Sequence, residues 1–220
     1  MIKRMKLPIT VYIDEAGRWP IAWPVMVGLV LGDKHTDRSH YQDSKILTTK
    51  RREQLADQIK SDSSIVRSTG SASAKEIDRN GIIRALRWAT IRWLYSLIKK
   101  ISNGPQLQWR WWYYIKLLNI IQSWLNVQLI IDGNHMFWLD INLWISVQTI
   151  IKWDRDIPQI SAASIIAKTT RDNLMIRFSI KYLWYELDRH MWYGTKKHYE
   201  AIVKLGLCEI HRKKRIKLKN

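Results

Sequence analysis

The residues best suited to chemistry are acidic side chains that follow short apolar runs. Asp14 and Glu15 end one such run, Asp132 ends a second, and Asp154 comes shortly after a third. Functional groups commonly gather where the strands of an α/β sheet terminate, so we expect these four carboxylates to lie close together. Crowded carboxylates repel one another unless cations neutralise them, and their oxygens suit Mg²⁺ or Mn²⁺. Two such ions about 4 Å apart can activate a water and stabilise the leaving oxygen of a phosphodiester.

The charge of the chain indicates a polyanionic partner. Lys and Arg number 37 against 19 Asp and Glu, which leaves a formal net charge of +18. Each phosphate that a basic surface neutralises releases counterions, so this surplus favours nucleic acid, although an anionic membrane surface would also attract it. The chain has no run of about 18 apolar residues, so we expect no membrane-spanning helix. Its basic start reaches Asp14 before a signal-like apolar segment can form, which favours a cytoplasmic protein.

Cysteine and motif content argue against several other enzyme classes. Cys208 is the single cysteine, so a disulfide framework and a cysteine-based zinc site are both excluded. HExxH, GxSxG and GxxxxGK[ST] motifs are absent, which disfavours a zinc protease, a serine hydrolase and a P-loop nucleotidase. A length of 220 residues with 46% hydrophobic residues fits one globular domain, with at most a small added subdomain.

Strands and helices that would position the carboxylates alternate along the chain. Apolar β-rich runs predict strands over residues 9–13, 25–31, 127–131 and 147–151. Helical periodicity predicts helices over residues 48–60, 161–182 and 198–205, and a helical region that follows a capping box at Ser73 and Glu76 and continues through Lys100. This alternation favours an α/β sheet flanked by helices. Residues 102–114 are predicted to form a surface loop.

Seven segments of the chain, in order from Tyr12 to Arg212, resemble the motifs of the type II ribonuclease H family. The first is YIDEAGRWPIAWPV, which resembles DEAGRGPxxGPV. The longest is KWDRDIPQISAASIIAKTTRDNLM, which resembles KGDxxxPxISAASIxAKxxRDxxM almost position for position. The others resemble DSKxL, EID, IDGN, HKGYGT and a closing HR, and they stand at residues 43–47, 76–78, 131–134, 190–195 and 211–212.

This resemblance implies a fold and an activity. The fold would be a ribonuclease-H-like mixed sheet flanked by helices over residues 1–180, followed by a small C-terminal helical subdomain and basic tail over residues 181–220. The activity would be metal-dependent hydrolysis of the RNA strand of RNA–DNA hybrids, and nicking 5′ of ribonucleotides embedded in duplex DNA. The products would carry 3′-hydroxyl and 5′-phosphate ends. We expect a monomer that uses Mg²⁺ or Mn²⁺.

The resemblance also implies roles for individual residues. The metal-binding catalytic set would be Asp14, Glu15, Asp132 and Asp154. Gly17, Arg18 and Trp19 would form a loop that contacts the 2′-hydroxyl, the group that distinguishes RNA from DNA. Tyr193 would pack on the sugar beside the junction, and Ser44 and Lys45 would contact backbone phosphates. Residues 161–175 are interpreted as a core helix, with Lys168 and Arg171 as further candidates for contact with the substrate or the acids.

Tryptophan stands where the family has glycine. Trp19, Trp23, Trp153 and Trp192 all occupy such positions, and the chain has 13 Trp but only 9 Gly and 2 Phe. Glycine belongs where the backbone has positive φ or approaches a ligand closely, and Trp is the worst replacement there. Met191 also replaces a family lysine.

Three explanations compete for these tryptophans. Chance substitution would not favour motif glycines, and a degenerate pseudoenzyme should also have lost acids, yet all four are present. We favour the third, in which UGA codons that the organism reads as glycine were translated as Trp. The basic aromatic stretch at residues 108–114 then becomes a flexible loop, and we do not interpret it as a binding site. If the tryptophans are real, the chain is instead a non-catalytic basic nucleic-acid-binding protein. Another metal nuclease of this fold, such as a resolvase, is disfavoured by the ISAASIIAK segment.

Overall fold

A five-stranded mixed sheet forms the centre of the molecule. The computed structural model describes residues 5–31, 41, 44, 46–102, 125–133, 146–150, 157–187 and 191–217. The strands are β1 (Met5–Ala16), β2 (Val25–Leu31), β3 (Val66–Ala72), β4 (Leu125–Asp132) and β5 (Ser146–Ile150). Their spatial order is β3-β2-β1-β4-β5. The β1–β2 and β2–β3 pairs are antiparallel, whereas β1–β4 and β4–β5 are parallel.

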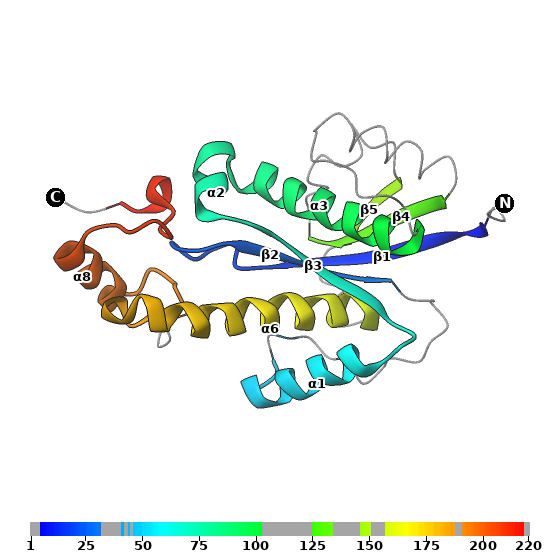
Figure 1. Ribbon diagram of the computed structural model, residues 1–220, viewed down its shortest axis with the longest axis horizontal. Coiled ribbons are helices and arrows are strands. Elements are labelled where there is room, and N and C mark those ends of the chain that lie inside the picture. The colour runs from blue at the N-terminus through cyan, green and yellow to red at the C-terminus, as the bar shows by residue number, and fades with distance from the viewer. Residues whose placement is uncertain are drawn as a thin grey trace.

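Helices cover both faces of this sheet (Figure 1). The helices α2 (Ala74–Asn80) and α3 (Ile82–Ser102) lie on one face. The helices α1 (Thr49–Ser61) and α6 (Pro158–Lys181) lie on the other. Beyond the end of α6, the chain forms a short 3-10 helix η1 (Leu183–Tyr185), the helix α8 (Lys196–Leu205) and a last 3-10 turn η2 (Lys213–Arg215). None of the described helices is long and apolar enough to cross a membrane.

Alternation along the strands divides the buried side chains between the two faces. Val11 and Ile13 of β1 join the apolar cluster that α3 covers, whereas Tyr12 packs with Ile160 of α6. Because successive side chains of a strand point to opposite faces, Asp14 lies on the same face as Tyr12, toward α6. The core therefore fixes the side of the sheet on which the first candidate catalytic carboxylate lies.

Most predicted elements are confirmed, and two differences have physical causes. The strand β3 was not predicted, because its sequence VRSTGSA shows little apolar alternation, and its strand structure depends on pairing with β2. The helical region predicted after Ser73 is two helices, since Gly81 between α2 and α3 has φ of +79°. The capping box of Ser73 and Glu76 is present as predicted. The loop predicted over residues 102–114 lies outside the described residues after Ser102.

The C-terminal elements pack against the loop that follows β1. Ile21 and Ala22 of that loop share one apolar cluster with Met175 of α6, Ile202 of α8 and Ile210. An isolated β-bridge also joins Ala22 to His211. The cluster thus contains side chains from both sides of the boundary predicted near residue 180, and that boundary stays a prediction. The contact places α8 and the last turn beside the end of the sheet where β1 finishes (Figure 1).

Gly28 allows α6 to approach the sheet closely. A Cβ atom at this position of β2 would lie 2.9 Å from the backbone nitrogen of Ala167, and closer still to the carbonyl oxygen of Ala163. Both of these atoms belong to the backbone of α6, so neither can move aside as a flexible side chain would. Gly28 is also the β2 partner of Asp14. The fit between β2 and α6 therefore depends on the absence of a side chain next to the candidate site.

We predict that Gly28→Ala lowers the free energy of unfolding by about 1–3 kcal/mol, because the added methyl group must push α6 away from β2. Urea denaturation monitored by circular dichroism measures this change. Ser71→Ala, at an exposed position of the neighbouring strand β3, is the matched control and should change stability by less than about 0.5 kcal/mol. Equal stability of the Gly28→Ala and Ser71→Ala proteins would show that the close approach is not needed.

Candidate functional site

The register between β1 and β4 brings two acidic residues together. Tyr12 is the partner of Ile130 and Ile13 is the partner of Ile131, so the next residues, Asp14 and Asp132, follow side by side. The two strands are parallel, and both acids stand at their carboxyl ends, as predicted from the apolar runs. Asp132 lies on the same face as Ile130, which packs with Tyr12 on the α6 side.

Burial and the charges of neighbouring acids raise the pKa values of Asp14 and Glu15. Burial and the charges of Glu15 and Asp132 together raise the pKa of Asp14 to about 8, although hydrogen bonds from Ser164 and from the Glu15 N–H act in the opposite direction. Burial also raises the pKa of Glu15, which the nearby Arg18 opposes. The Arg18 guanidinium lies 3.4 Å from Glu15 Oε1. The three acids are thus close enough to disfavour one another's ionised form.

A divalent cation would relieve this repulsion, and the chemistry of the donor atoms suits one. Carboxylate oxygens are the ligands that Mg²⁺ and Mn²⁺ prefer, and Asp14, Glu15 and Asp132 supply them from two adjacent strand ends. Within the described ranges, no group of three or more acidic, histidine or cysteine side chains is arranged to hold a metal ion. Asp154, the fourth predicted ligand, lies outside the described residues, four positions after the end of β5.

The loop after β1 begins at a position that requires glycine. Gly17 has φ of +86°, and a Cβ atom there would lie 2.7 Å from Arg171 Cδ. Arg171 belongs to α6 and is 1% exposed, so the loop passes directly over its guanidinium. Of the three residues predicted to contact a 2′-hydroxyl, Gly17 is therefore fixed by both its backbone angle and its packing, and it places Arg18 beside Glu15.

A buried arginine from the C-terminus holds this loop in place. Arg212 is fully buried, and its guanidinium donates to four backbone carbonyl oxygens of the loop. The acceptors and distances are Gly17 at 2.6 Å, Pro20 at 2.9 Å, Arg18 at 3.0 Å and Trp23 at 2.8 Å. Burial and the charges of Arg171 and Arg215 lower the pKa of Arg212 to about 9, which still leaves it charged at neutral pH. A charged guanidinium with this many acceptors is a strong anchor.

Asp78 anchors the basic turn that follows Arg212. Its carboxylate accepts hydrogen bonds from the backbone N–H groups of Lys213 at 2.8 Å and Lys214 at 3.2 Å. These bonds satisfy the backbone N–H groups at the start of η2, and the side chains of Lys213 and Lys214 stay exposed. Arg215 also donates to the Arg18 carbonyl at 2.8 Å. The EID segment, which the sequence identified without a role, thus fixes a basic turn next to the loop.

Tyr193 is half-exposed beside this loop, as a substrate contact requires. Its side chain is 43% exposed, and the Arg171 guanidinium lies 5.9 Å from the centre of its ring. The same guanidinium donates to the Met191 carbonyl at 3.1 Å. In addition, the Ile21 N–H donates to the Trp192 carbonyl at 3.2 Å, which ties the turn before Tyr193 to the loop. The structure therefore brings Tyr193 and the Gly17 loop together on one surface.

Ser44 points into the protein. Its side chain is 2% exposed, and its Oγ lies 2.7 Å from Ser164 Oγ, the hydroxyl that also bonds Asp14. Arg52 of α1 donates to the Ser44 carbonyl at 3.2 Å and lies 3.3 Å from Asp172. This arrangement gives Ser44 a partner that supports Asp14, whereas its predicted phosphate contact stays a prediction. Lys45 lies outside the described residues.

The predicted core helix carries groups that serve the site. Ser164 of α6 bonds the Asp14 carboxyl, and Arg171 supports the Gly17 loop and the Tyr193 turn. Lys168 and Arg171, predicted as possible contacts of the substrate or the acids, both pair with Asp172, each at 3.5 Å. Sequence reasoning missed the roles of Ser164 and Arg212. The signal available for Arg212 was the closing HR motif, which was identified without a partner.

Two tryptophans stand in backbone conformations that favour glycine. Trp23 and Trp192 both have φ of +69°, and the indole N–H of each is buried without a hydrogen-bond partner. Each such backbone costs about 1–3 kcal/mol, and each unpartnered N–H costs a similar amount. These costs offset much of what the burial of two indoles contributes. The structure therefore supports the expectation that glycine belongs at both positions.

Trp19 occupies the exposed surface of the loop. Its indole is 68% exposed, and the guanidinium groups of Arg18 and Arg215 lie 5.9 Å and 5.3 Å from the centre of its ring. The indole therefore engages two cations that could otherwise meet a phosphate. Trp153, the remaining tryptophan at a family glycine position, lies outside the described residues.

The comparisons with known proteins agree on one family. The model of the family described as Ribonuclease HII matches residues 11–103 and 129–219. Ribonuclease HII of Treponema denticola is 37% identical over 201 residues, which cover 91% of this chain and 94% of that protein. Ribonuclease HII of Nitrosomonas europaea is 40% identical over 201 residues, which cover 91% of this chain and 79% of that protein.

Solved structures show the same fold. The ribonuclease HII of Archaeoglobus fulgidus, solved in complex with PCNA, matches with a TM-score of 0.62 at 21% identity and covers 96% of both chains. Ribonuclease H2 of Pyrococcus horikoshii matches with a TM-score of 0.60 at 22% identity, over 93% of this chain and 92% of that one. Bst-RNase HIII, solved in complex with Mn²⁺, matches with a TM-score of 0.66 at 16% identity, over 93% of this chain and 66% of that one.

We expect the chain as written, made in a host that reads the standard code, to fold poorly or to be nearly inactive. Changing Trp19, Trp23, Trp153 and Trp192 to Gly should restore Mg²⁺-dependent cleavage of an RNA–DNA hybrid. The changes relieve two strained backbones, uncover the loop, and remove a bulky neighbour of Asp154, where a displacement of about 1 Å can cost about a hundredfold in rate. Cleavage of a labelled hybrid in a gel assay measures the recovery.

Trp184→Gly is the matched control, because this indole is 81% exposed and lies outside the family motifs. It should restore nothing. The gene provides an independent test, since UGA at the Trp codons supports the recoding explanation. UGG at the four motif positions would overturn it.

Proposed function

This chain belongs to the ribonuclease HII family, and from that premise we propose that it nicks duplex DNA 5′ of an embedded ribonucleotide and also cuts the RNA strand of RNA–DNA hybrids. Membership makes the chain a metal-dependent endoribonuclease with ribonuclease H activity. The observation that supports the finer proposal is that Arg171 contacts both the Tyr193 ring and Gly17, which stands two residues after Glu15. We propose that the cut leaves 3′-hydroxyl and 5′-phosphate ends.

The acids of the strand ends would hold the divalent cations. Asp14, Glu15 and Asp132 supply the described part of the ligand set, and Asp154 is proposed as its fourth member. Two bound Mg²⁺ or Mn²⁺ ions would activate a water and neutralise the charge on the leaving oxygen. Because its pKa is about 8, the Asp14 carboxyl group is mostly protonated at neutral pH without metal, and it must lose this proton to serve as a ligand. The Ser164 hydroxyl favours the ionised form and holds the carboxylate in place.

The loop and Tyr193 would recognise the ribose. Arg212 binds the carbonyl oxygens of Gly17, Arg18 and Pro20, so these acceptors are turned toward the protein interior. The opposite side of the loop is then available to approach the 2′-hydroxyl at short range. Tyr193 projects from the neighbouring turn with 43% of its side chain exposed, which suits packing against the sugar beside the junction.

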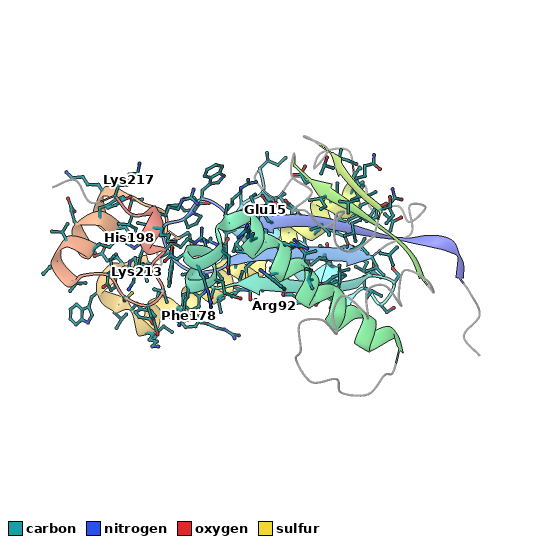
Figure 2. The ribbon with its side chains drawn as sticks, turned by 90° about the horizontal axis from the view of Figure 1, so that it is seen from above. Glu15, Arg92, Phe178, His198, Lys213 and Lys217 are labelled. Carbon is teal, nitrogen blue, oxygen red and sulfur yellow. The ribbon has the colours of Figure 1, made fainter. Side chains whose placement is uncertain are left out.

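The basic C-terminal turn would contribute affinity for the duplex. Lys213, Lys214 and Lys217 are exposed, and Figure 2 shows Lys213 and Lys217 in the same part of the molecule as His198 of α8. Asp78 and Arg212 fix this segment beside the loop, so its positive charge is held near the proposed path of the nucleic acid. Each phosphate contact of this kind adds salt-dependent affinity without sequence preference.

The experiment compares three labelled duplexes in the glycine-restored chain with Mg²⁺ or Mn²⁺. The first contains one embedded ribonucleotide, the second is an RNA–DNA hybrid, and the third is all DNA. We expect a nick on the 5′ side of the single ribonucleotide, cuts throughout the RNA strand of the hybrid, and no cleavage of DNA. Cutting of the hybrid without nicking at the single ribonucleotide would contradict the proposed junction recognition.

Asp14→Asn is the companion variant in the same assay. It should abolish cleavage of both substrates while binding to the hybrid stays within about twofold, because the carboxylate serves the metal and the basic surface supplies affinity. Gel-shift titration at constant salt measures the binding. Cleavage by the variant at close to the parent rate would refute the assignment of Asp14 as a metal ligand.

The raised pKa of Asp14 predicts a pH dependence of stability in metal-free protein. An ordinary Asp carboxyl has a pKa of 3.8, and that of folded Asp14 is about 8. Between these values the folded state holds a proton that the unfolded state has released, so this group stabilises the fold at low pH and ceases to do so as pH rises through the window. We therefore expect metal-free Asp14→Asn to gain stability over the parent from about pH 5 to about pH 8.

Urea denaturation of both proteins in EDTA, at several pH values, measures this difference. Excess Mg²⁺ should stabilise the parent and leave the variant nearly unchanged, because metal binding requires the ionised carboxylate. A constant stability difference across the pH range would contradict the raised pKa.

A further inference from the structure

Two buried histidines outside the acid cluster form a direct contact. His198 of α8 is fully buried, and His211 of the C-terminal segment is 1% exposed. Their Nε2 atoms lie 3.1 Å apart, a hydrogen-bond distance. Figure 2 shows His198 among the C-terminal elements, away from Glu15. Because both rings are buried, each ring nitrogen needs a suitable partner, and these partners determine which nitrogen of each ring carries the proton.

The protein around His211 determines its tautomer. The backbone N–H of Cys208 donates to His211 Nδ1 at 3.1 Å, and a backbone N–H can only donate. His211 Nδ1 is therefore an acceptor, which places the ring proton on Nε2. The Cys208 thiol lies 3.1 Å from the same nitrogen, and burial raises the pKa of that thiol, so it adds no negative charge. Burial lowers the pKa of His211, which keeps the ring neutral.

The tautomer of His211 in turn determines that of His198. His211 Nε2–H must donate to His198 Nε2, so the proton of His198 is on Nδ1. His198 Nδ1 lies 2.9 Å from the carbonyl oxygen of Tyr193 and donates to it. Protonation of either ring would put a second hydrogen where one nitrogen must accept. The result is an ordered series of hydrogen bonds, the histidine relay, which runs from Cys208 through both imidazoles to Tyr193.

This series ends at the residue that faces the proposed substrate. The Tyr193 carbonyl accepts a second hydrogen bond from the Thr195 N–H at 2.8 Å. Two donors on one carbonyl oxygen fix the orientation of the peptide group and therefore the direction in which the Tyr193 side chain leaves the backbone. The residue next to His211 is Arg212, which holds the Gly17 loop. The dipeptide of His211 and Arg212 therefore supports both the Tyr193 turn and the Gly17 loop.

We propose that His211 and His198 are positioning residues, which act through the Tyr193 carbonyl to hold the Tyr193 ring against the ribose at the junction. The inference rests on the role proposed for Tyr193 in recognising that junction. It assigns a function to two buried side chains that the hydrolytic chemistry does not use. Both imidazoles are buried and form contacts with each other, with Cys208 and with the Tyr193 carbonyl, so we expect their effect on cleavage to pass through Tyr193.

The first test measures the tautomers directly in the folded chain. Nitrogen-15 NMR of the imidazole rings at pH 7 should show His198 protonated only at Nδ1 and His211 protonated only at Nε2. A charged imidazolium on either ring, or the opposite tautomers, would overturn the relay. This readout needs no enzymatic activity, and it is made on the glycine-restored chain.

The second test uses a matched pair of amide substitutions in the glycine-restored chain. The amide of Asn reaches the position of Nδ1, so His198→Asn keeps a donor to the Tyr193 carbonyl. The amide of Gln reaches the position of Nε2, so His198→Gln keeps the contact to His211 and loses the donor to Tyr193. We expect His198→Gln to lower kcat on the single-ribonucleotide duplex by about tenfold or more, since small misplacements of a positioning group are costly. His198→Asn should retain most of the rate.

A double-mutant cycle separates positioning from a general structural effect. If His198 acts through Tyr193, then His198→Gln combined with Tyr193→Ala should be no slower than Tyr193→Ala alone. Additive losses, or equal losses in the Asn and Gln variants, would overturn the relay while leaving the proposed junction recognition intact. Full activity of Tyr193→Ala would instead remove the role of Tyr193, and the functional part of the relay with it. Thermal unfolding of each variant checks that the fold is retained.

Discussion

Asp14 and Asp132 lie together because β1 pairs in parallel with β4, and the rest of the site is built around the cost of that contact. Burial and repulsion raise the pKa of Asp14 to about 8, so a proton or a cation at this carboxyl group is favoured. The fold partly offsets this cost through a hydrogen bond from the Ser164 hydroxyl of α6 to Asp14. Gly28 lets α6 come close enough to the sheet to supply it. The end of the sheet that carries these acids is thus a locally unfavourable arrangement that the surrounding packing maintains.

The C-terminal segment serves the site from a distance along the chain. Arg212 is the anchor of the loop after β1, and its guanidinium is satisfied by four carbonyl oxygens, which is why its burial is tolerated. Asp78 holds the turn that follows, and His211 contacts His198 just before it. The start of the basic C-terminal segment is therefore structural: His211 and Arg212 are buried, whereas Lys213, Lys214 and Lys217 are exposed.

The tryptophans at motif positions conflict with the backbone around them. At residues 23 and 192 the chain adopts positive φ, and the two indoles pack edge to face with ring centres 5.4 Å apart. Neither indole N–H has a hydrogen-bond partner in the described structure. The backbone path of the loop and of the Tyr193 turn is therefore the one that glycine favours, and the indoles fill space around it. This agreement between conformation and motif is independent of the codon argument.

The sequence by itself determined the family, the mixed sheet with flanking helices and the acids at the ends of β1 and β4. Those features are local: alternation, helical period, the Ser73 capping box and motif spacing are written within short segments. Only the tertiary structure decided that VRSTGSA is a strand, because that segment depends on pairing with β2. The same holds for Arg212, whose acceptors lie 189 to 195 residues away, and for the contact between His198 and His211. Periodicity reports which side of an element is buried, but the partner of a buried polar group is set by the three-dimensional packing of distant segments.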